Sequence, residues 1–269
     1  MINITPNSFS DGGKFLGREE VLNQLKVLKN QGVRIFDFGA ESTAPFNDPI
    51  SSELEWTRLA PILESVLDSQ ALDQREDSIS IDTYKFDVFK QAYELIRKKG
   101  SSFKVIWNDV SGKLEDEVIE FLKEHDFKLV ISHNLCPDRI RTSSHMDFTC
   151  EHIDLVNYFS CYEQKLKSHD LLSKVIFDPC FGFSKTVEQN YELLSSMQKW
   201  LDPRFQWILG VSRKSFLQKL CSSDDKAQRT QQSEYLHTLL ISRWMKTFKT
   251  ENILIRLHDP AVFNSASLV

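Results

Sequence analysis

Eight short apolar runs, each followed by a longer amphipathic segment, constrain the fold of this chain more than any other feature of its sequence. A run such as 128–132 carries Leu, Val and Ile in succession, so both faces of such a strand would be buried. The segment 114–124 repeats apolar residues three and four positions apart, with charges between them, as an amphipathic helix does. Strict alternation of the two patterns predicts the α/β class, with a parallel sheet covered by helices.

The number of strand-and-helix units predicts the architecture. Eight units predict a (β/α)8 TIM barrel that forms a single domain over residues 1–269, with a short first strand because the first run begins at Met1. A doubly wound open sheet is the alternative, but it would place a glycine-rich turn after an early strand, and we find none. The expected strands are 1–3, 33–37, 78–82, 104–108, 128–132, 174–177, 206–210 and 252–256. The expected helices are 19–31, 53–68, 86–99, 114–124, 153–167, 186–200 and 232–249. We expect a surface loop at 143–149 and a mobile connection at 221–232.

The composition argues against several function classes. With 33 basic and 38 acidic residues, the formal net charge is -5, so the charge of the whole chain favours neither nucleic acid nor an anionic membrane. No apolar run is long enough to span a membrane. The five cysteines are odd in number and no two are separated by only two residues. This pattern favours reduced thiols in a cytoplasmic protein over a disulfide framework.

Polar residues directly follow four of the apolar runs. They are Asp82, Asn108, Asp109, Asp178, Arg256 and His258. Taking such groups out of water costs several kcal/mol unless they are paired or bind something. Because the carboxyl ends of parallel strands meet at one face of a barrel, these residues predict one functional site.

The two aspartates admit three interpretations. Asp82 and Asp178 could hold the amino-pyrimidine edge of a heterocycle by charge-assisted hydrogen bonds. They could also bind a metal or act as acid and base. Each could instead cap the following helix, as aspartate often does. One aspartate alone favours capping, whereas two of them, together with Asn108 and Asp109, favour a functional site.

Basic residues gather after the last two runs. The segment 212–215, Ser-Arg-Lys-Ser, follows the seventh run, where barrels frequently bind phosphate, although an Arg-Lys pair is also typical of a solvated turn. Arg256 and His258 are two residues apart, so in a strand they would point the same way and form an anion pocket. An ion pair with Asp259 is the alternative interpretation.

Other candidates are weaker when taken alone. The segments 3–13 and 41–45 combine hydroxyls, amides, glycine and proline, as active-site loops do. His133 and Cys136 could bind zinc, but two ligands are insufficient. Cys180 lacks the histidine pattern of a nucleophile, so we expect it to serve packing.

Taken together, these segments resemble the dihydropteroate synthase family. The matching segments occur in the family's order and span nearly the whole chain: 3–13, 41–45, 80–85, 108–112, 178–185, 210–216 and 256–259. The resemblance implies a (β/α)8 barrel and a transferase of folate synthesis. Such an enzyme joins 7,8-dihydropterin-6-ylmethyl diphosphate to 4-aminobenzoate and releases diphosphate with Mg2+. It also implies a cytoplasmic homodimer and binding of sulfonamides, which mimic 4-aminobenzoate.

The resemblance implies a role for each matching residue. The pterin would be held by Asp82, Asn108, Asp178 and Lys214. The diphosphate would be held by Asn3, Thr43, Arg256 and His258, with Asn3 also at the metal. The aminobenzoate would be held by Phe9, Thr43, Pro45, Phe183, Lys214 and Ser215. The catalytic set would be Asp11, Asp82, Asp178 and Lys214.

The implied chemistry fits these residue types. Departure of diphosphate leaves a pterin-methyl cation, which the carboxylates around the ring would stabilise. Arg256, His258 and Mg2+ would stabilise the leaving anion. The amine of 4-aminobenzoate is a sufficient nucleophile, so no covalent protein nucleophile is needed.

The chain departs from the family pattern in its loops. Ala44 stands where the family has arginine, Asn7 where it has aspartate, Cys180 where it has glycine and Ser132 where it has methionine. The pterin residues are all present, while the loop contacts are altered. Two alternatives to an active synthase therefore stay open: a pterin-binding homologue without turnover and, less favoured, a pterin-binding methyltransferase.

Overall fold

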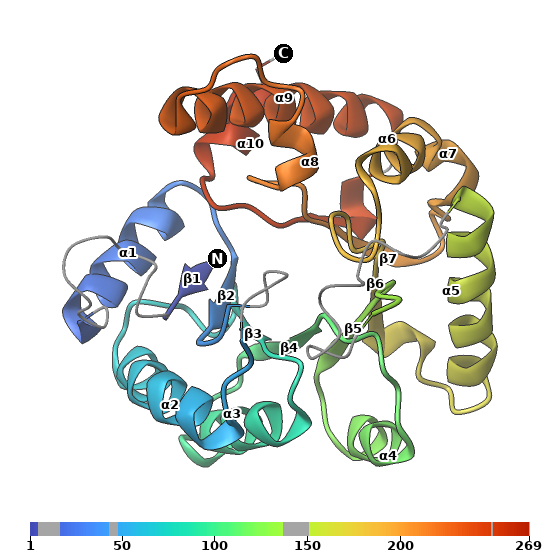
Figure 1. Ribbon diagram of the computed structural model, residues 1–269. Coiled ribbons are helices and arrows are strands. Elements are labelled where there is room, and N and C mark those ends of the chain that lie inside the picture. Colours follow the sequence, from blue (N-terminus) through green and yellow to red (C-terminus); the bar gives the residue numbers. More distant parts are fainter. Residues whose placement is uncertain (5–16, 43–47, 137–150, 249, 269) are drawn as a thin grey trace. The chain divides into compact units, whose positions relative to one another are not determined.

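The computed structural model describes residues 1–4, 17–42, 48–136, 151–248 and 250–268. In them strands and helices alternate along the chain (Figure 1). The chain divides into two compact units, Met1–Ile131 and Ser132–Val269. No helix of the described ranges is long and apolar enough to cross a membrane.

The first unit is built on parallel strands that neighbour one another in chain order. The strands are β1 Ile2–Asn3, β2 Ile35–Gly39, β3 Ser78–Asp82, β4 Lys104–Asp109 and β5 Lys128–Ser132, whose last residue begins the second unit. The helices are α1 Arg18–Asn30, α2 Ser52–Asp68, α3 Phe86–Lys98 and α4 Asp116–Glu124. The register pairs Gly39 with Asp82 and Asp82 with Asn108, so the polar ends of β3 and β4 are adjacent.

Aromatic packing joins the strands of the first unit to its helices. Trp107 of β4 stacks on Phe89 of α3, with ring centroids 4.8 Å apart, and both rings are buried. The indole N–H of Trp107 donates to the carbonyl oxygen of Thr83 at 2.7 Å, so the buried ring leaves no unpaired donor. α2 and α3 pack side by side (Figure 1). These contacts fix the ends of β3 and β4 relative to their helices.

The second unit repeats the pattern. Its parallel strands are β6 Val175–Asp178, β7 Gln206–Leu209 and β8 Ile253–Ile255. Its helices are α5 His152–Lys167, α6 Val187–Ser195, α7 Met197–Trp200, α8 Ser215–Gln218, α9 Lys226–Thr247 and α10 Ala261–Ala266, with 3-10 turns η2 Leu172–Lys174 and η3 Thr250–Asn252. The ring centroids of Phe177 in β6 and Trp207 in β7 are 5.7 Å apart, and both rings pack against Phe159 of α5.

The predicted α/β class is confirmed, and eight strands alternate with helices in the described residues. Two local predictions are wrong. The mobile connection predicted at 221–232 instead contains the start of α9, because the Asp225 side chain caps the helix by accepting from the Gln228 N–H at 2.9 Å. The helix predicted at 186–200 is interrupted at Ser196, whose φ of -102° and ψ of 14° are not helical. The loop predicted at 143–149 lies outside the described residues.

Candidate active site

A buried polar cluster joins the neighbouring strands β2, β3 and β4. Asp37 is 7% exposed and accepts a hydrogen bond from the Ser80 hydroxyl at 2.6 Å. The amide nitrogen of Asn108 donates to both carboxylate oxygens of Asp37, at 3.3 and 3.2 Å. Because the nitrogen of Asn108 is used inside the protein, its Oδ1 is the atom that can accept from a ligand. Sequence reasoning missed Asp37, although a carboxylate between Phe36 and Phe38 is a visible signal.

Asp82 ends β3 and is 9% exposed. The neighbouring residue Gly39 makes room for it, since a Cβ there would come within 3.3 Å of Oδ2 of Asp82. The helix that follows, α3, has Lys85 as its N-cap, so Asp82 does not cap it. The capping interpretation is also wrong for Asp178, because Thr186 caps α6 by accepting from the Gln189 N–H.

Asp109, the next residue after Asn108, is occupied within its own loop. Its Oδ1 accepts from the Ser111 N–H and its Oδ2 from the Ser111 hydroxyl, both at 2.7 Å. Burial raises the pKa of Asp109 to about 7, while the bonds from Ser111 lower it. These contacts with Ser111 stabilise the turn that follows β4.

A charged cluster lies where the loops after β2 and β3 meet α2. The ammonium group of Lys85 is paired with Glu41 and, at 2.8 Å, with Glu55. Glu41 also accepts from the Tyr84 hydroxyl at 3.1 Å. Burial raises the pKa of Glu55. Burial lowers the pKa of Lys85, but its hydrogen bonds to Glu41 and Glu55 outweigh this, so the pKa is raised and the lysine stays charged.

Asp178 closes β6 in the second unit and is held on two sides. Its Oδ1 accepts from the Cys180 N–H at 2.7 Å, and its backbone oxygen accepts from the His133 N–H at 2.8 Å. Part of the residue remains exposed, yet burial raises the pKa of its carboxyl. The Cys180 N–H and the positive charges of Lys214, Arg256 and Lys185 act in the opposite direction. A ligand that donates hydrogen bonds would favour the ionised carboxylate.

Lys214 lies on the ring of Phe183. Its Nζ is 4.2 Å from the ring centroid, in the range of a cation–π contact. Gly182, at a φ of +81°, permits this approach, because a Cβ there would come within 3.2 Å of Cδ of Lys214. Arg213 instead makes an ion pair with Glu234 of α9 at 2.8 Å. The solvated-turn interpretation of the Ser-Arg-Lys-Ser segment therefore fits Arg213, whereas Lys214 lies against the loop that follows β6.

The end of β8 supplies further donors. Nδ1 of His258 is 2.8 Å from the hydroxyl of Ser212, and the Arg256 N–H donates to the Leu209 oxygen at 3.0 Å. Burial lowers the pKa of His258 to about 3, and the positive charges of Arg213, Arg256 and Lys214 add to this. An anion bound beside His258 would oppose this effect and favour the protonated ring. Asp259, considered above as an ion-pair partner, accepts from the Ala261 N–H at the start of α10.

Comparison with known proteins identifies the family of this chain. The family described as pterin binding enzyme matches residues 1–250. The dihydropteroate synthase of Synechocystis is 32% identical over 237 residues, which are 85% of this chain and 75% of that protein. The chain belongs to the dihydropteroate synthase family. The plant relatives it matches are longer bifunctional proteins, and the chain spans about half of them, for example 45% of the folate synthesis bifunctional protein of Pisum sativum.

Solved dihydropteroate synthases share the fold. The Clostridium difficile enzyme, studied with pteroic acid, has a TM-score of 0.78 and 27% identity, and the match covers 99% of this chain and 92% of that one. The Thermus thermophilus enzyme, in complex with 4-aminobenzoate, has a TM-score of 0.74 and 26% identity, covering 100% of this chain and 92% of that one.

Several residues of the predicted aminobenzoate and catalytic sets, and two departures from the family pattern, lie outside the described residues. They are Phe9, Asp11, Thr43 and Pro45, together with the departures Asn7 and Ala44. Asn3 is described, in β1 and opposite Gly39 of β2. In the described ranges no three His, Cys, Asp or Glu side chains group as a metal site. The amide oxygen of Asn3 nevertheless suits Mg2+, which keeps several waters and takes few protein ligands beside substrate phosphates.

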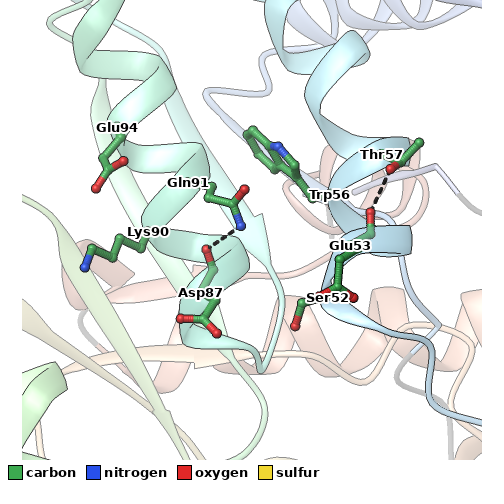
Figure 2. Close-up of a pocket in the computed structure, with 8 residues that line it drawn as sticks. All are labelled: Ser52, Glu53, Trp56, Thr57, Asp87, Lys90, Gln91 and Glu94. Atoms are coloured by element: carbon green, nitrogen blue, oxygen red, sulfur yellow. Dashed lines mark hydrogen bonds between the residues drawn. The ribbon is translucent and has the colours of Figure 1, made fainter.

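A surface pocket lies between α2 and α3. Figure 2 shows its lining side chains: Ser52, Glu53, Trp56, Thr57, Asp87, Lys90, Gln91 and Glu94. The hydroxyl of Thr57 and the amide of Gln91 each donate to the backbone of their own helix, at 2.7 and 3.1 Å. The pocket contains no residue of the predicted site.

Proposed function

We propose that this protein is a dihydropteroate synthase that joins 7,8-dihydropterin-6-ylmethyl diphosphate to 4-aminobenzoate and releases diphosphate. One observation carries the proposal: the expected pterin residues lie at the carboxyl ends of strands, or in the loop after one, in a chain that matches this family over residues 1–250. They are Asp82, Asn108, Asp178 and Lys214.

The pterin would be recognised mainly by acceptors. The amino-pyrimidine edge of a pterin presents N–H donors, which match the carboxylates of Asp82 and Asp178 and the Oδ1 of Asn108. Lys214, stacked on Phe183, would reach the ring from the loop after β7. This donor–acceptor match would orient the pterin methylene group toward the diphosphate site.

Catalysis would separate charge across the substrate. As the bond to diphosphate breaks, the pterin-methyl group gains positive charge, which Asp82 and Asp178 would stabilise. Arg256 and His258 would bind the leaving diphosphate, and binding would raise the low pKa of His258 so that it takes up a proton. Asn3 would hold Mg2+ beside the diphosphate, where the ion neutralises negative charge. The amine of 4-aminobenzoate then attacks the methylene carbon and loses a proton.

We propose that both units belong to one domain, a closed (β/α)8 barrel over residues 1–269 with a short first strand. The support is the parallel, chain-ordered pairing of strands inside each unit and the similarity of the chain to solved dihydropteroate synthases over almost its full length. Closure would bring the carboxyl ends of β3, β4 and β6 to one face.

The aminobenzoate site would use the loops after β1, β2, β6 and β7. Phe183 and Lys214 would contact the aromatic ring, Ser215 would bind the carboxylate, and Phe9, Asp11, Thr43 and Pro45 would complete the site. Sulfonamides, which resemble 4-aminobenzoate, would compete for it. Ala44 in place of arginine removes one charge, which would lower the rate roughly a hundredfold.

We also propose a cytoplasmic homodimer. On α9, Tyr235 is 64% exposed and Leu239, one turn further on, is 41% exposed. A contiguous exposed apolar patch marks a protein–protein interface, and these two side chains would contribute to such a patch. A shift from dimer to monomer in Leu239→Glu, measured by light scattering, would support this interface.

The proposed reaction is tested by diphosphate release from purified protein. With the pterin diphosphate, Mg2+ and 4-aminobenzoate, we expect turnover that requires aminobenzoate and falls at least about 100-fold in Asp178→Ala. Calorimetry with the pterin runs beside it. Tight pterin binding without turnover would identify the protein as a binding homologue, and unchanged turnover in Asp178→Ala would refute the proposed site.

A further inference from the structure

A lysine without exposed surface belongs to the loop that follows β6. Lys185 is 0% exposed, and its Nζ donates to the backbone oxygens of His133 at 2.8 Å, Phe183 at 3.1 Å and Cys180 at 3.3 Å. An ammonium group has three N–H donors, so each of them has a carbonyl acceptor. A buried charge is retained only when it is compensated in this way. The loop is therefore folded around the charge.

The backbone of this loop needs support. Cys180, Gly182 and Ser184 have φ values of 55°, 81° and 47°, in the left-handed region. That region is unfavourable for Cys180 and Ser184, which carry a Cβ. Two of the carbonyls that Lys185 binds lie inside this irregular stretch. Its hydrogen bonds therefore oppose the tendency of the loop to relax to another conformation.

Each carbonyl that Lys185 binds is linked to a residue of the proposed pterin site. The N–H groups of His133 and Cys180 donate to Asp178, at its backbone oxygen and its Oδ1. The Nζ of Lys214 lies 4.2 Å from the centroid of the Phe183 ring. Displacing these carbonyls would displace both the acceptor and the cation that face the pterin.

We propose that Lys185 is a positioning residue for pterin binding, which fixes the loop that orients Asp178 and Lys214 and supplies a positive charge near the Asp178 carboxylate. The inference rests on the proposed function, because it assigns a role to those two residues at the same site. Lys185 itself has no exposed surface and is not expected to touch the substrate.

The charge near Asp178 makes the proposal testable by pH. The groups of this unit that act on Asp178 are the cations Lys214, Arg256 and Lys185, and the Cys180 thiol beside it. Burial raises the pKa of Asp178, and the three cations oppose that rise. Without Lys185 the pKa would rise further, so Asp178 would lose its charge at a higher pH.

The experiment is calorimetry of the dihydropterin-methyl diphosphate with wild type, Lys185→Met and Lys185→Arg between about pH 5.5 and 8.5. In Lys185→Met we expect affinity to weaken about tenfold or more near pH 6 and to recover toward high pH, relative to wild type. Lys185→Arg keeps the charge but not the compact three-fold donor. It should retain the wild-type pH profile with a uniformly lower affinity. The exposed Lys199→Met is the matched control and should behave as wild type.

The outcomes separate this inference from the proposed function. If the wild type neither binds the pterin nor turns over, the proposed function fails. If the wild type is active and Lys185→Met weakens binding equally at every pH, the charge role is overturned. If Lys185→Met does not fold, Lys185→Arg decides, because wild-type affinity in that variant would overturn the loop role. Thermal unfolding of each variant identifies folding failure.

Discussion

In the proposed pterin site, Asp37 would act through another residue, Asn108. Its two oxygens take the amide hydrogens of Asn108, while Ser80 donates to one of them at 2.6 Å. This leaves the Oδ1 of the Asn108 amide as the end that would accept from the proposed pterin. Replacing Asp37 would leave the donors of Asn108 and Ser80 without an acceptor, which costs free energy in a buried site.

We expect Asp37→Asn to weaken pterin binding about 10- to 100-fold, which corresponds to about 1–3 kcal/mol. The new NH2 group faces the donor of Asn108 or Ser80, so one hydrogen bond is lost or the Asn108 amide turns. Calorimetry gives the affinity. Ser80→Ala, which removes one donor and leaves Asn108 in place, should have the smaller effect. Equal affinities in Asp37→Asn and wild type would contradict this role.

At the residue scale, the sequence predicted a site where a polar group ends an apolar run, and the structure places Asp82 and Asp178 at strand ends. It did not predict Asp37, because the partners of a mid-strand carboxylate come from strands 43 and 71 residues away. Pairings over such distances depend on the register between strands, which the sequence of one strand alone does not predict.

At the element scale, Lys85 joins three elements. Its ammonium group pairs with Glu41 after β2 and Glu55 in α2, whose side chains are only 3% and 1% exposed. The pairing ties the loop after β2, which carries the expected aminobenzoate residues, to α2 and to the end of β3. Removing the cation would leave two carboxylates in a region with little water.

We expect Lys85→Met to lower the free energy of unfolding by about 3 kcal/mol at pH 7. The loss should shrink toward pH 5, because the pKa of Glu55 is already raised by burial and protonation removes the uncompensated charge. Urea unfolding at both pH values measures this. Lys123→Met, which breaks an exposed pair with Glu120, should change stability by less than about 1 kcal/mol. An equal effect of the two substitutions would refute the buried cluster.

Helix boundaries show what local patterns leave out. The first turns of α9 are polar and exposed, which led to the prediction of a loop, although the capping aspartate at 225 was present in the sequence. The break at Ser196 has no proline or glycine to mark it. In both places exposure and packing, rather than apolar periodicity, decide where the helix begins or ends.

At the scale of the whole molecule, three histidines with lowered pKa values are expected to make stability depend on pH. Burial lowers the pKa of His133 to about 2, of His258 to about 3 and of His237 to about 4. Both ring nitrogens of His237 are without a hydrogen-bond partner in the described structure. The unfolded chain, with a histidine pKa near 6.5, therefore binds protons that the folded chain does not.

We expect stability to fall as the pH drops below about 6.5, with His237 alone contributing a loss of about 2 kcal/mol at pH 5. His237→Leu should flatten this part of the profile, because leucine has no proton to bind. Urea unfolding at pH 7 and pH 5 gives the difference. The exposed His169→Leu should leave the slope unchanged. A steep profile that persists in His237→Leu would show that the other groups cause the acid sensitivity.

Cys180, which lies beside the Asp178 carboxylate, can serve as a chemical label for the loop after β6. Cys180 is 3% exposed, and burial, with the nearby charge of Asp178, raises its pKa to about 12. At neutral pH its thiolate fraction is then lower than that of an ordinary thiol by about a thousandfold, so alkylation should occur only when the loop opens. Mass spectrometry after iodoacetamide treatment, with the exposed Cys161 as internal standard, would measure how often it does. Bound pterin should slow the labelling of Cys180 alone, and labelling of both cysteines at one rate would show that the loop is open most of the time.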